Sequence, residues 1–266
     1  GSDLSPKPFK LIMDKPPLPS PPSPARVLAA PTPAPSLLCL KPSPPRNLPA
    51  IDNGSTLVAD QALVSPPEIV SGILHRQTKA VLASGSKIGK TWMLLNLVAC
   101  IVAGIPFLGW ATTACRVLYI NFEIHRAFIK QRLQVIKEKY VFQDLDNLDV
   151  WTLRGQGADF DALWNEILER VAGEGYGVIV LDPIYKLMVG RSENTASGVG
   201  VLCNHIERLA EHSGAAIVYA HHYTKGNAAS KKAIDRMSGS GVLGRDVDTA
   251  LTVTEHAEDG CYVLET

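Results

Sequence analysis

The sequence predicts an α/β fold in which helices lie on both faces of a mostly parallel central sheet. Strand-like apolar segments alternate with amphipathic segments of helical spacing from residue 79 onward, a pattern typical of βαβ units. The apolar strand 80–83 leads through a small-residue loop directly into a helix. A proline-rich segment of different composition precedes this region, so we also expect an extended N-terminal arm.

The arm is defined by its proline content, because residues 1–50 hold 15 of the 19 prolines in the 266-residue chain. Proline removes backbone donors and favours polyproline II, which predicts a semi-rigid arm or linker over residues 1–64 and a folded domain over 65–266. Short apolar islands interrupt the prolines. They favour an arm that docks on its own domain or on a partner protein, with a plain linker as the alternative.

Composition limits the classes of partner and compartment. The formal net charge is zero, so a polyanion such as DNA would have to meet a local basic patch. The five cysteines are odd in number and lack a CxxC pair, which argues against a disulfide framework and a zinc site and favours a reducing cytoplasm. The sequence contains no apolar run as long as a membrane span and no signal-peptide pattern at its start, so we expect a cytoplasmic protein without a membrane partner.

Elements before residue 141 follow from local pattern. Residues 67–74 predict a short lead-in helix. The helix after the loop has only Asn96 as a polar residue between 92 and 102, so we expect it to be buried on most sides. Residues 116–122 are rich in β-branched and aromatic residues and predict a strand. In residues 126–140 apolar positions recur at helical spacing, which predicts an amphipathic helix.

The second half of the chain continues the alternation. We expect a strand at 148–153, a helix at 159–172, a strand at 176–182, a helix at 201–212 and a strand at 215–220. The strand 176–182 has four consecutive apolar residues, which is typical of the centre of a parallel sheet. The segments 249–254 and 261–265 flank Glu258, Asp259 and Gly260 and predict a hairpin.

The loop after the first strand predicts a phosphate site of the Walker A type. Unpaired N–H groups and the positive end of the dipole at a helix start attract an anion. In such loops a lysine reaches the β and γ phosphates and the following hydroxyl binds Mg²⁺, roles that fall to Lys90 and Thr91. The residues expected to hold the nucleotide are Ser84, Gly85, Ser86, Lys87, Ile88, Gly89, Lys90, Thr91 and Trp92. The consensus has glycine where this chain has Ser84, and a chance match is the alternative.

Asp182 is the second metal candidate. It ends the apolar strand 176–182, and an acid at the carboxyl end of a strand beside the loop can hold Mg²⁺ or its water shell. Asp before Pro183 is also common in strand-ending turns. Together with the preceding loop, the metal role is the better interpretation.

With these segments in order, residues 65–266 resemble the RecA-like ATPases of the plasmid RepA kind, relatives of DnaB-type hexameric replicative helicases and carriers of an AAA-type ATPase domain. The resemblance is carried by SGSKIGKTWMLLNLVACIVAGIPFLGW, VLYINFE, VIVLDPIYKLM, AIVYAHHYTKG and RMSGSGVLGRDVDTAL. It implies Mg²⁺-dependent hydrolysis of ATP by a homo-oligomer, expected as a hexameric ring, acting on single-stranded DNA in DNA replication. The chain ends soon after the last hairpin strand, where such domains continue, so we expect a longer natural protein.

The resemblance also implies roles for single residues. Glu123 would be the general base, with a capping acid of the next helix as the alternative. His222 would sense the γ phosphate, although a histidine at a strand end is often structural. Arg245 is the first candidate for a finger that reaches the nucleotide of a neighbouring subunit, with Lys225 and Arg236 behind it and a solvated cation as the alternative.

The loops at 190–200 and 225–241 match the positions at which the family contacts single-stranded DNA. The cations expected to bind phosphate there are Lys225, Lys231, Lys232 and Arg236. No aromatic platform for stacked bases is evident beside them. The second interpretation is a nucleotide-dependent switch or scaffold, in which ATP closes an assembly and the proline-rich arm recruits a partner without unwinding. A small-molecule kinase is the third.

Overall fold

A computed structural model describes residues 50–140, 144–156, 160–188, 196–222, 242–256, 258 and 261–266. The chain divides into two units, Gly1–Leu57 and Val58–Thr266. Of the first unit, residues 50–57 are described, and they include most of the short helix α1 (Gly54–Ala59), which has no buried residue. Most of the predicted arm therefore lies outside the described residues.

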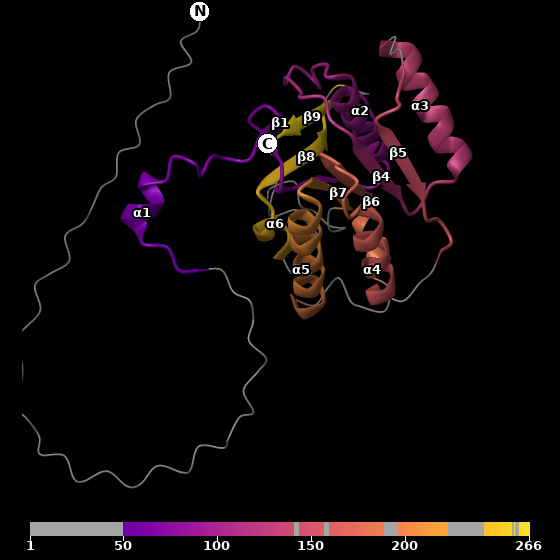
Figure 1. Cartoon of the computed structure of the whole chain (residues 1–266). Coiled ribbons are helices and arrows are strands. Elements are labelled where there is room, and N and C mark those ends of the chain that lie inside the picture. The colour runs from indigo at the N-terminus through magenta and orange to yellow at the C-terminus, as the bar shows by residue number, and fades with distance from the viewer. Residues whose placement is uncertain are drawn as a thin grey trace, which may run out of the picture. The chain divides into compact units, whose positions relative to one another are not determined.

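Seven strands form the central sheet of the second unit, in the order β5-β4-β6-β7-β3-β8-β9 (Figure 1). Their bounds are β3 (Lys79–Ser84), β4 (Val117–Asn121), β5 (Leu148–Thr152), β6 (Val178–Asp182), β7 (Ala216–His222), β8 (Thr249–Glu255) and β9 (Tyr262–Glu265). Neighbours run parallel except for β8 and β9, which are antiparallel. The predictions of a mostly parallel sheet and of a hairpin at its end are confirmed.

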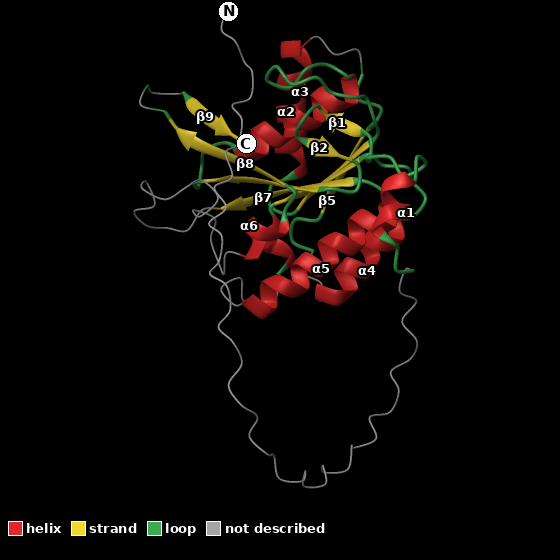
Figure 2. Cartoon of the chain, turned by 90° about the vertical axis from the view of Figure 1, so that its left-hand side faces the viewer, coloured by secondary structure: helices red, strands yellow, loops and turns green. Residues whose placement is uncertain are grey.

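Helices cover both faces of this sheet (Figure 2). The helices α2 (Lys90–Ala103) and α3 (Arg126–Tyr140) enclose one apolar core with the sheet. The helices α4 (Phe160–Val171), α5 (Ala196–Ser213) and the short α6 (Val242–Asp246) enclose the other. A 3-10 turn, η1 (Ile184–Leu187), follows β6. The architecture is thus the three-layer α/β arrangement that the alternating pattern predicts.

Strand β3 contributes to both cores. All six of its residues are buried, with Val81 packed into the core beneath α4 and α5 and Leu82 into the core beneath α2 and α3. The helix α2 that follows is buried along most of its length, as its nearly unbroken apolar sequence predicts. It ends at Gly104, whose left-handed φ of 64° closes the helix.

The expected lead-in helix over 67–74 is wrong. The structure has an antiparallel pair there, β1 (Glu68–Val70) and β2 (Leu74–His75). Gly72 adopts a φ of 69° between the two strands, and a left-handed residue interrupts a helix. The β-branched residues Ile69 and Val70, both buried, also favour the extended conformation.

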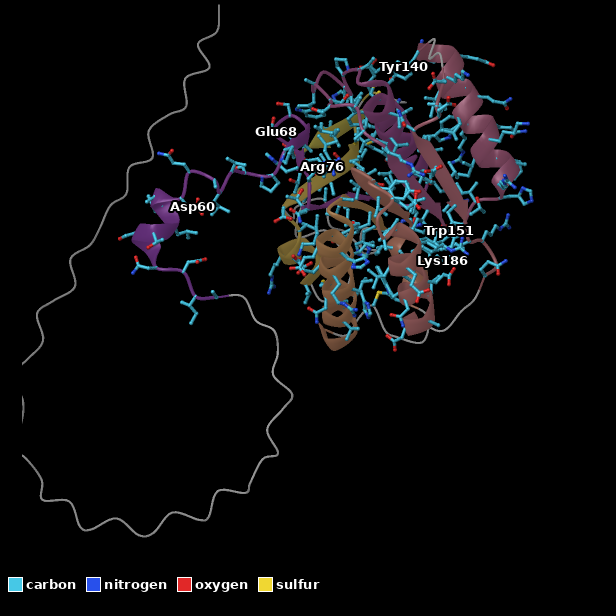
Figure 3. The ribbon with its side chains drawn as sticks, in the orientation of Figure 1. Asp60, Glu68, Arg76, Tyr140, Trp151 and Lys186 are labelled. Atoms are coloured by element: carbon cyan, nitrogen blue, oxygen red, sulfur yellow. The ribbon has the colours of Figure 1, made fainter. Side chains whose placement is uncertain are left out.

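Strand β5 is one edge of the sheet, hydrogen-bonded to β4, and exposed side-chain contacts lie along it. Trp151, labelled in Figure 3, lies beneath the guanidinium of Arg170 from α4, which is 4.7 Å from its ring centre. Arg116, just before β4, pairs with Asp149 and with Glu174, each at 2.8 Å. These exposed contacts connect the edge strand, which has sheet on one side only, to neighbouring parts of the chain.

Two further observations concern the cysteines and the helices. The described cysteines, Cys100, Cys115, Cys203 and Cys261, carry free thiols. Among the described residues, no helix combines the length and the apolar character needed to cross a bilayer.

The packing of α2 gives a stability prediction. Ile101 is 0% exposed in the core between α2 and the sheet. Ile101→Ala is expected to lower the free energy of unfolding by about 2–5 kcal/mol, because it removes buried methylenes and leaves a cavity. The control is Val135→Ala on α3, where the side chain is 53% exposed and the change should stay within about 0.5 kcal/mol. Urea unfolding measures both, and equal effects would contradict the assigned core.

Candidate active site

The carboxyl ends of four parallel strands converge beside the start of α2. Ser84 at the end of β3 pairs in register with His222 at the end of β7, and Asn121 at the end of β4 pairs with Asp182 at the end of β6. A cavity of about 340 Å³ opens at this edge. It is lined by Lys87, Gly89, Lys90, Thr91, Trp92, Glu123, Ile124, Arg132, Asp182, Pro183 and His222.

The loop between β3 and α2 is shaped to expose backbone N–H groups. Lys87 and Gly89 have left-handed φ values of 67° and 87°. Gly89 makes no side-chain cap on α2, and the first turn of that helix has no acidic residue. The N–H groups and the positive dipole end of a helix of 14 residues are therefore left for an external anion.

The departure from the Walker A consensus at Ser84 has a structural explanation. Ser84 is still the last residue of β3 and is 0% exposed. Its hydroxyl donates to the carbonyl of Gly85 at 3.0 Å and accepts from the Lys90 ammonium at 3.1 Å. The chain turns at Gly85, where a Cβ would come within 2.9 Å of the Ile88 side chain. That contact is with the end of a flexible side chain, which can move aside, so the space does not demand glycine at 85. Serine fits at 84 because its hydroxyl has both an acceptor and a donor there.

Lys90 is held inside the loop by acceptors on three residues. Its Nζ donates to the carbonyls of Gly85 at 2.8 Å and Ser84 at 3.3 Å, and lies 2.9 Å from Nδ1 of His222. Burial lowers the pKa of Lys90 to about 8, and the charges of Asp182 and Glu123 oppose this shift. The ammonium is thus placed between the loop and the two acids.

Asp182 is the buried acid of the site, 4% exposed. Burial raises the pKa of its carboxyl group, while hydrogen bonds from Tyr119 and Thr91 act in the opposite direction. The hydroxyl of Tyr119 donates to Oδ2 of Asp182 at 2.5 Å. Asp182 and Thr91, the two predicted metal residues, line the same cavity.

Glu123 is the exposed acid of the site and lines the same cavity. Its carboxylate accepts from the hydroxyl of Tyr185 at 3.4 Å. At the start of α3 the N–H of Ala127 donates to Nδ1 of His125 at 3.2 Å, so a side-chain cap of this helix comes from His125. The geometry leaves the Glu123 carboxylate facing the cavity.

His222 ends β7 and contacts the site through Lys90. Burial lowers its pKa, and the charge of Lys90 lowers it further. A neutral ring accepts at Nδ1 from the lysine, which leaves Nε2 as the protonated nitrogen. The Tyr185 ring lies 5.8 Å from the imidazole.

The donor set suits a hard divalent cation of the Mg²⁺ type. Asp182 offers a carboxylate and Thr91 a hydroxyl, both of them oxygen ligands. Within the described ranges, no group of three or more His, Cys, Asp or Glu side chains gathers into a cage for a metal. This arrangement fits Mg²⁺, which is usually held by one or two protein ligands together with substrate phosphates and water.

The sequence pattern did not identify three residues that line the cavity or contact its acids. Arg132 of α3 lines the cavity, with its guanidinium 5.1 Å from the ring centre of Trp92. Tyr119 and Tyr185 contact the two acids. For Arg132 a signal existed, since it lies three residues after the buried Ile129 and so on the inward side of an amphipathic helix.

Of the cations predicted for a neighbouring subunit and for DNA, only Arg245 is among the described residues, and it does not line this cavity. Arg245 is exposed on α6, which precedes β8 at the amino-terminal edge of the sheet. Its neighbour Asp246 contacts Lys79, the first residue of β3, whereas the loop follows the last. Lys225, Lys231, Lys232 and Arg236, with the loop 225–241, lie outside the described residues, as do residues 190–195 of the other loop.

Comparison with known proteins gives one family match. The model of one family, described as an AAA domain, matches residues 45–228. The matched stretch includes the loop with Lys90 and Thr91, both acids and His222. No curated protein matches the chain.

The low pKa of Lys90 predicts a pH dependence of nucleotide binding. A phosphate favours the charged lysine, so its pKa must rise in the complex above the value of about 8 in the free protein. The affinity for ADP therefore has its full value below pH 8 and falls above it, by at most about tenfold per pH unit for one proton. Calorimetric titrations from neutral to alkaline pH measure this.

Lys90→Arg is the control for this pH dependence. Arginine stays charged throughout, so the variant should show a flatter profile over the same range. An equal decline in both proteins would contradict the assignment to Lys90.

Proposed function

Because the chain belongs to the AAA domain family of P-loop ATPases, we propose that it is a Mg²⁺-dependent ATPase of the RepA-like hexameric helicase kind that acts on single-stranded DNA. One observation carries the proposal. Residues from the ends of four strands, namely Lys90 after β3, Glu123 after β4, Asp182 on β6 and His222 on β7, line one cavity at the start of α2.

The cavity and its neighbour suit a nucleoside triphosphate. Phosphates would bind the N–H groups at the start of α2, with Lys90 on the β and γ phosphates. A second cavity of about 360 Å³ shares Lys87, Gly89 and Trp92 with the first. Its other lining residues include Phe107, Leu108 and Tyr262, an apolar and aromatic surface of the kind that holds a purine base.

Glu123 and Asp182 have different roles in this proposal. Glu123 is exposed and faces the cavity, so it can accept a proton from the attacking water, while the Tyr185 hydroxyl orients its carboxylate. Thr91 and Asp182 would hold Mg²⁺, which when bound neutralises charge on the transferred phosphoryl group. A phosphate that recruits Lys90 also draws it from His222, which supports a sensing role for the histidine.

Homo-oligomer formation is proposed from the position of Arg245. The six residues of β3 separate the α6 end of the strand from the loop by roughly 16 Å, at about 3.3 Å per residue. Arg245 makes no ion pair among the described residues, and its helix lies beyond the opposite edge of the sheet from its own loop. These facts support a role at the nucleotide of a neighbouring subunit.

Single-stranded DNA is proposed from the resemblance to RepA-like helicases, since the expected contact residues lie outside the described part of the chain. The second candidate, a switch or scaffold that binds ATP without unwinding, is favoured by the proline-rich arm, which suits recruitment of a partner protein. A kinase for a small molecule would need a phosphate acceptor site beside the γ phosphate, where the cavity is lined by Lys90, Glu123 and His222.

The proposal predicts DNA-stimulated hydrolysis by an assembly. The wild-type protein should hydrolyse ATP faster when single-stranded DNA is added and should have the mass of an oligomer in solution. Lys90→Ala should lose hydrolysis, since it removes the ammonium group that is proposed to contact the β and γ phosphates. Hydrolysis rates and light scattering measure these outcomes.

Each alternative has its own result in this assay. An oligomer with ATPase activity that DNA does not stimulate would favour the switch, and a monomer without stimulation would favour the kinase. Unchanged hydrolysis by Lys90→Ala would contradict the nucleotide site itself.

The trans role of Arg245 can be tested by complementation. Arg245→Ala and Glu123→Gln should each lose most hydrolysis, the first by roughly 10³-fold or more if Arg245 is a finger. In an equal mixture, roughly a quarter of the sites join an intact Glu123 to an intact Arg245 from the neighbour, and activity should return. A mixture as inactive as its components would show that Arg245 does not act between subunits.

A further inference from the structure

Tyr119 makes a buried hydrogen bond that the catalytic scheme above does not use. It lies on β4, next to β6, and is 0% exposed. Its register partner is Val180, two residues before Asp182. The ring therefore extends along the sheet toward the carboxyl edge, where its hydroxyl donates to Oδ2 of Asp182 at 2.5 Å.

This contact differs from ordinary core packing. Burying a hydroxyl is unfavourable unless it finds a partner, and a hydrogen bond to a carboxylate is roughly twice as strong as one between neutral groups. Tyr219 on β7 shows the contrast. It is also 0% exposed, but its hydroxyl has no hydrogen-bond partner among the described residues. The Tyr119 hydroxyl is thus engaged by an acid of the site.

The hydroxyl of Thr91 completes the group. Thr91 lines the cavity together with Asp182, and its side chain opposes the rise in the pKa of both Tyr119 and Asp182. A carboxylate that accepts from Tyr119 cannot rotate without losing this bond. The orientation of the Asp182 carboxylate is therefore fixed before any ligand binds. Residues that hydrogen-bond to metal ligands commonly raise metal affinity in this way.

We propose that Tyr119 is a positioning residue for the divalent cation, because its hydroxyl fixes the Asp182 carboxylate beside Thr91. The inference rests on the proposed function, since it assumes that Asp182 and Thr91 hold Mg²⁺ with the nucleotide. Tyr119 does not line the cavity. It therefore acts through Asp182 and should affect the metal more than the nucleotide.

The test is the effect of Mg²⁺ on ADP binding in Tyr119→Phe. Calorimetry gives the dissociation constant for ADP with excess Mg²⁺ and with EDTA. The constant in EDTA divided by the constant with Mg²⁺ measures the contribution of the metal. Tyr119→Phe keeps the ring and removes only the hydroxyl. Loss of such supporting groups typically costs about 10–100-fold in metal affinity, so we expect the ratio to fall toward one while ADP binding in EDTA stays as in the wild type.

Tyr219→Phe is the matched control, because it removes a buried hydroxyl from the same sheet without a carboxylate partner. It should leave the ratio unchanged, and thermal unfolding shows that both variants fold. A ratio unchanged in Tyr119→Phe, an equal loss in EDTA, an equal effect of Tyr219→Phe or a failure of Tyr119→Phe to fold would overturn the positioning role. A wild-type protein that binds no ADP with Mg²⁺ would overturn the proposed function as well.

Discussion

The register of the parallel strands is the constraint on which the site depends. Ser84 is level with His222, and Asn121 is level with Asp182. The pairing of β6 with β7 places the second pair two residues before the first, so all four strands present their functional groups at the carboxyl edge of the sheet. A shift of one residue would turn Asp182 to the opposite face of the sheet, away from α2. The chain also leaves β3 through α2 and returns at β4, with β7 and β6 between them, and such crossovers open a crevice at the carboxyl ends.

Burial and charge balance one another inside this crevice. Lys90 and Asp182 are both nearly inaccessible, 8% and 4% exposed, and burial alone disfavours the charged form of each. Each charge offsets part of that penalty for the other. The carbonyl oxygens that hold Lys90 are neutral, whereas a phosphate offers charged acceptors with stronger hydrogen bonds. The resting contacts of the lysine therefore order its side chain without outcompeting an anionic ligand.

Sequence pattern predicted those parts of the fold that follow from local chemistry. The span of α3 was predicted as observed, Arg126–Tyr140, because apolar residues recur at helical spacing. The loop residues and Asp182 were found because strand ends and a helix start mark them. The hairpin at β1 and β2 was missed, since the left-handed Gly72 overrides an apparent helical pattern. Tyr119 was missed for another reason: its role depends on pairing between β4 and β6, which local pattern does not specify.

A clamp at the opposite edge of the sheet links the loop strand to α6. The Lys79 ammonium pairs with Glu207 of α5 and with Asp246 of α6, the latter at 3.2 Å. Its backbone exchanges two bonds with Asp248, at 2.8 and 3.0 Å. Burial lowers the pKa of Lys79, but these acids outweigh it and raise the value overall, so the lysine stays charged. Strand β3, which leads into the loop, and helix α6, which carries Arg245, are thus linked through Lys79. Because β3 is hydrogen-bonded on both sides, α6 keeps a fixed distance from the loop of the same chain, which is the arrangement that the proposed role of Arg245 in a neighbouring subunit requires.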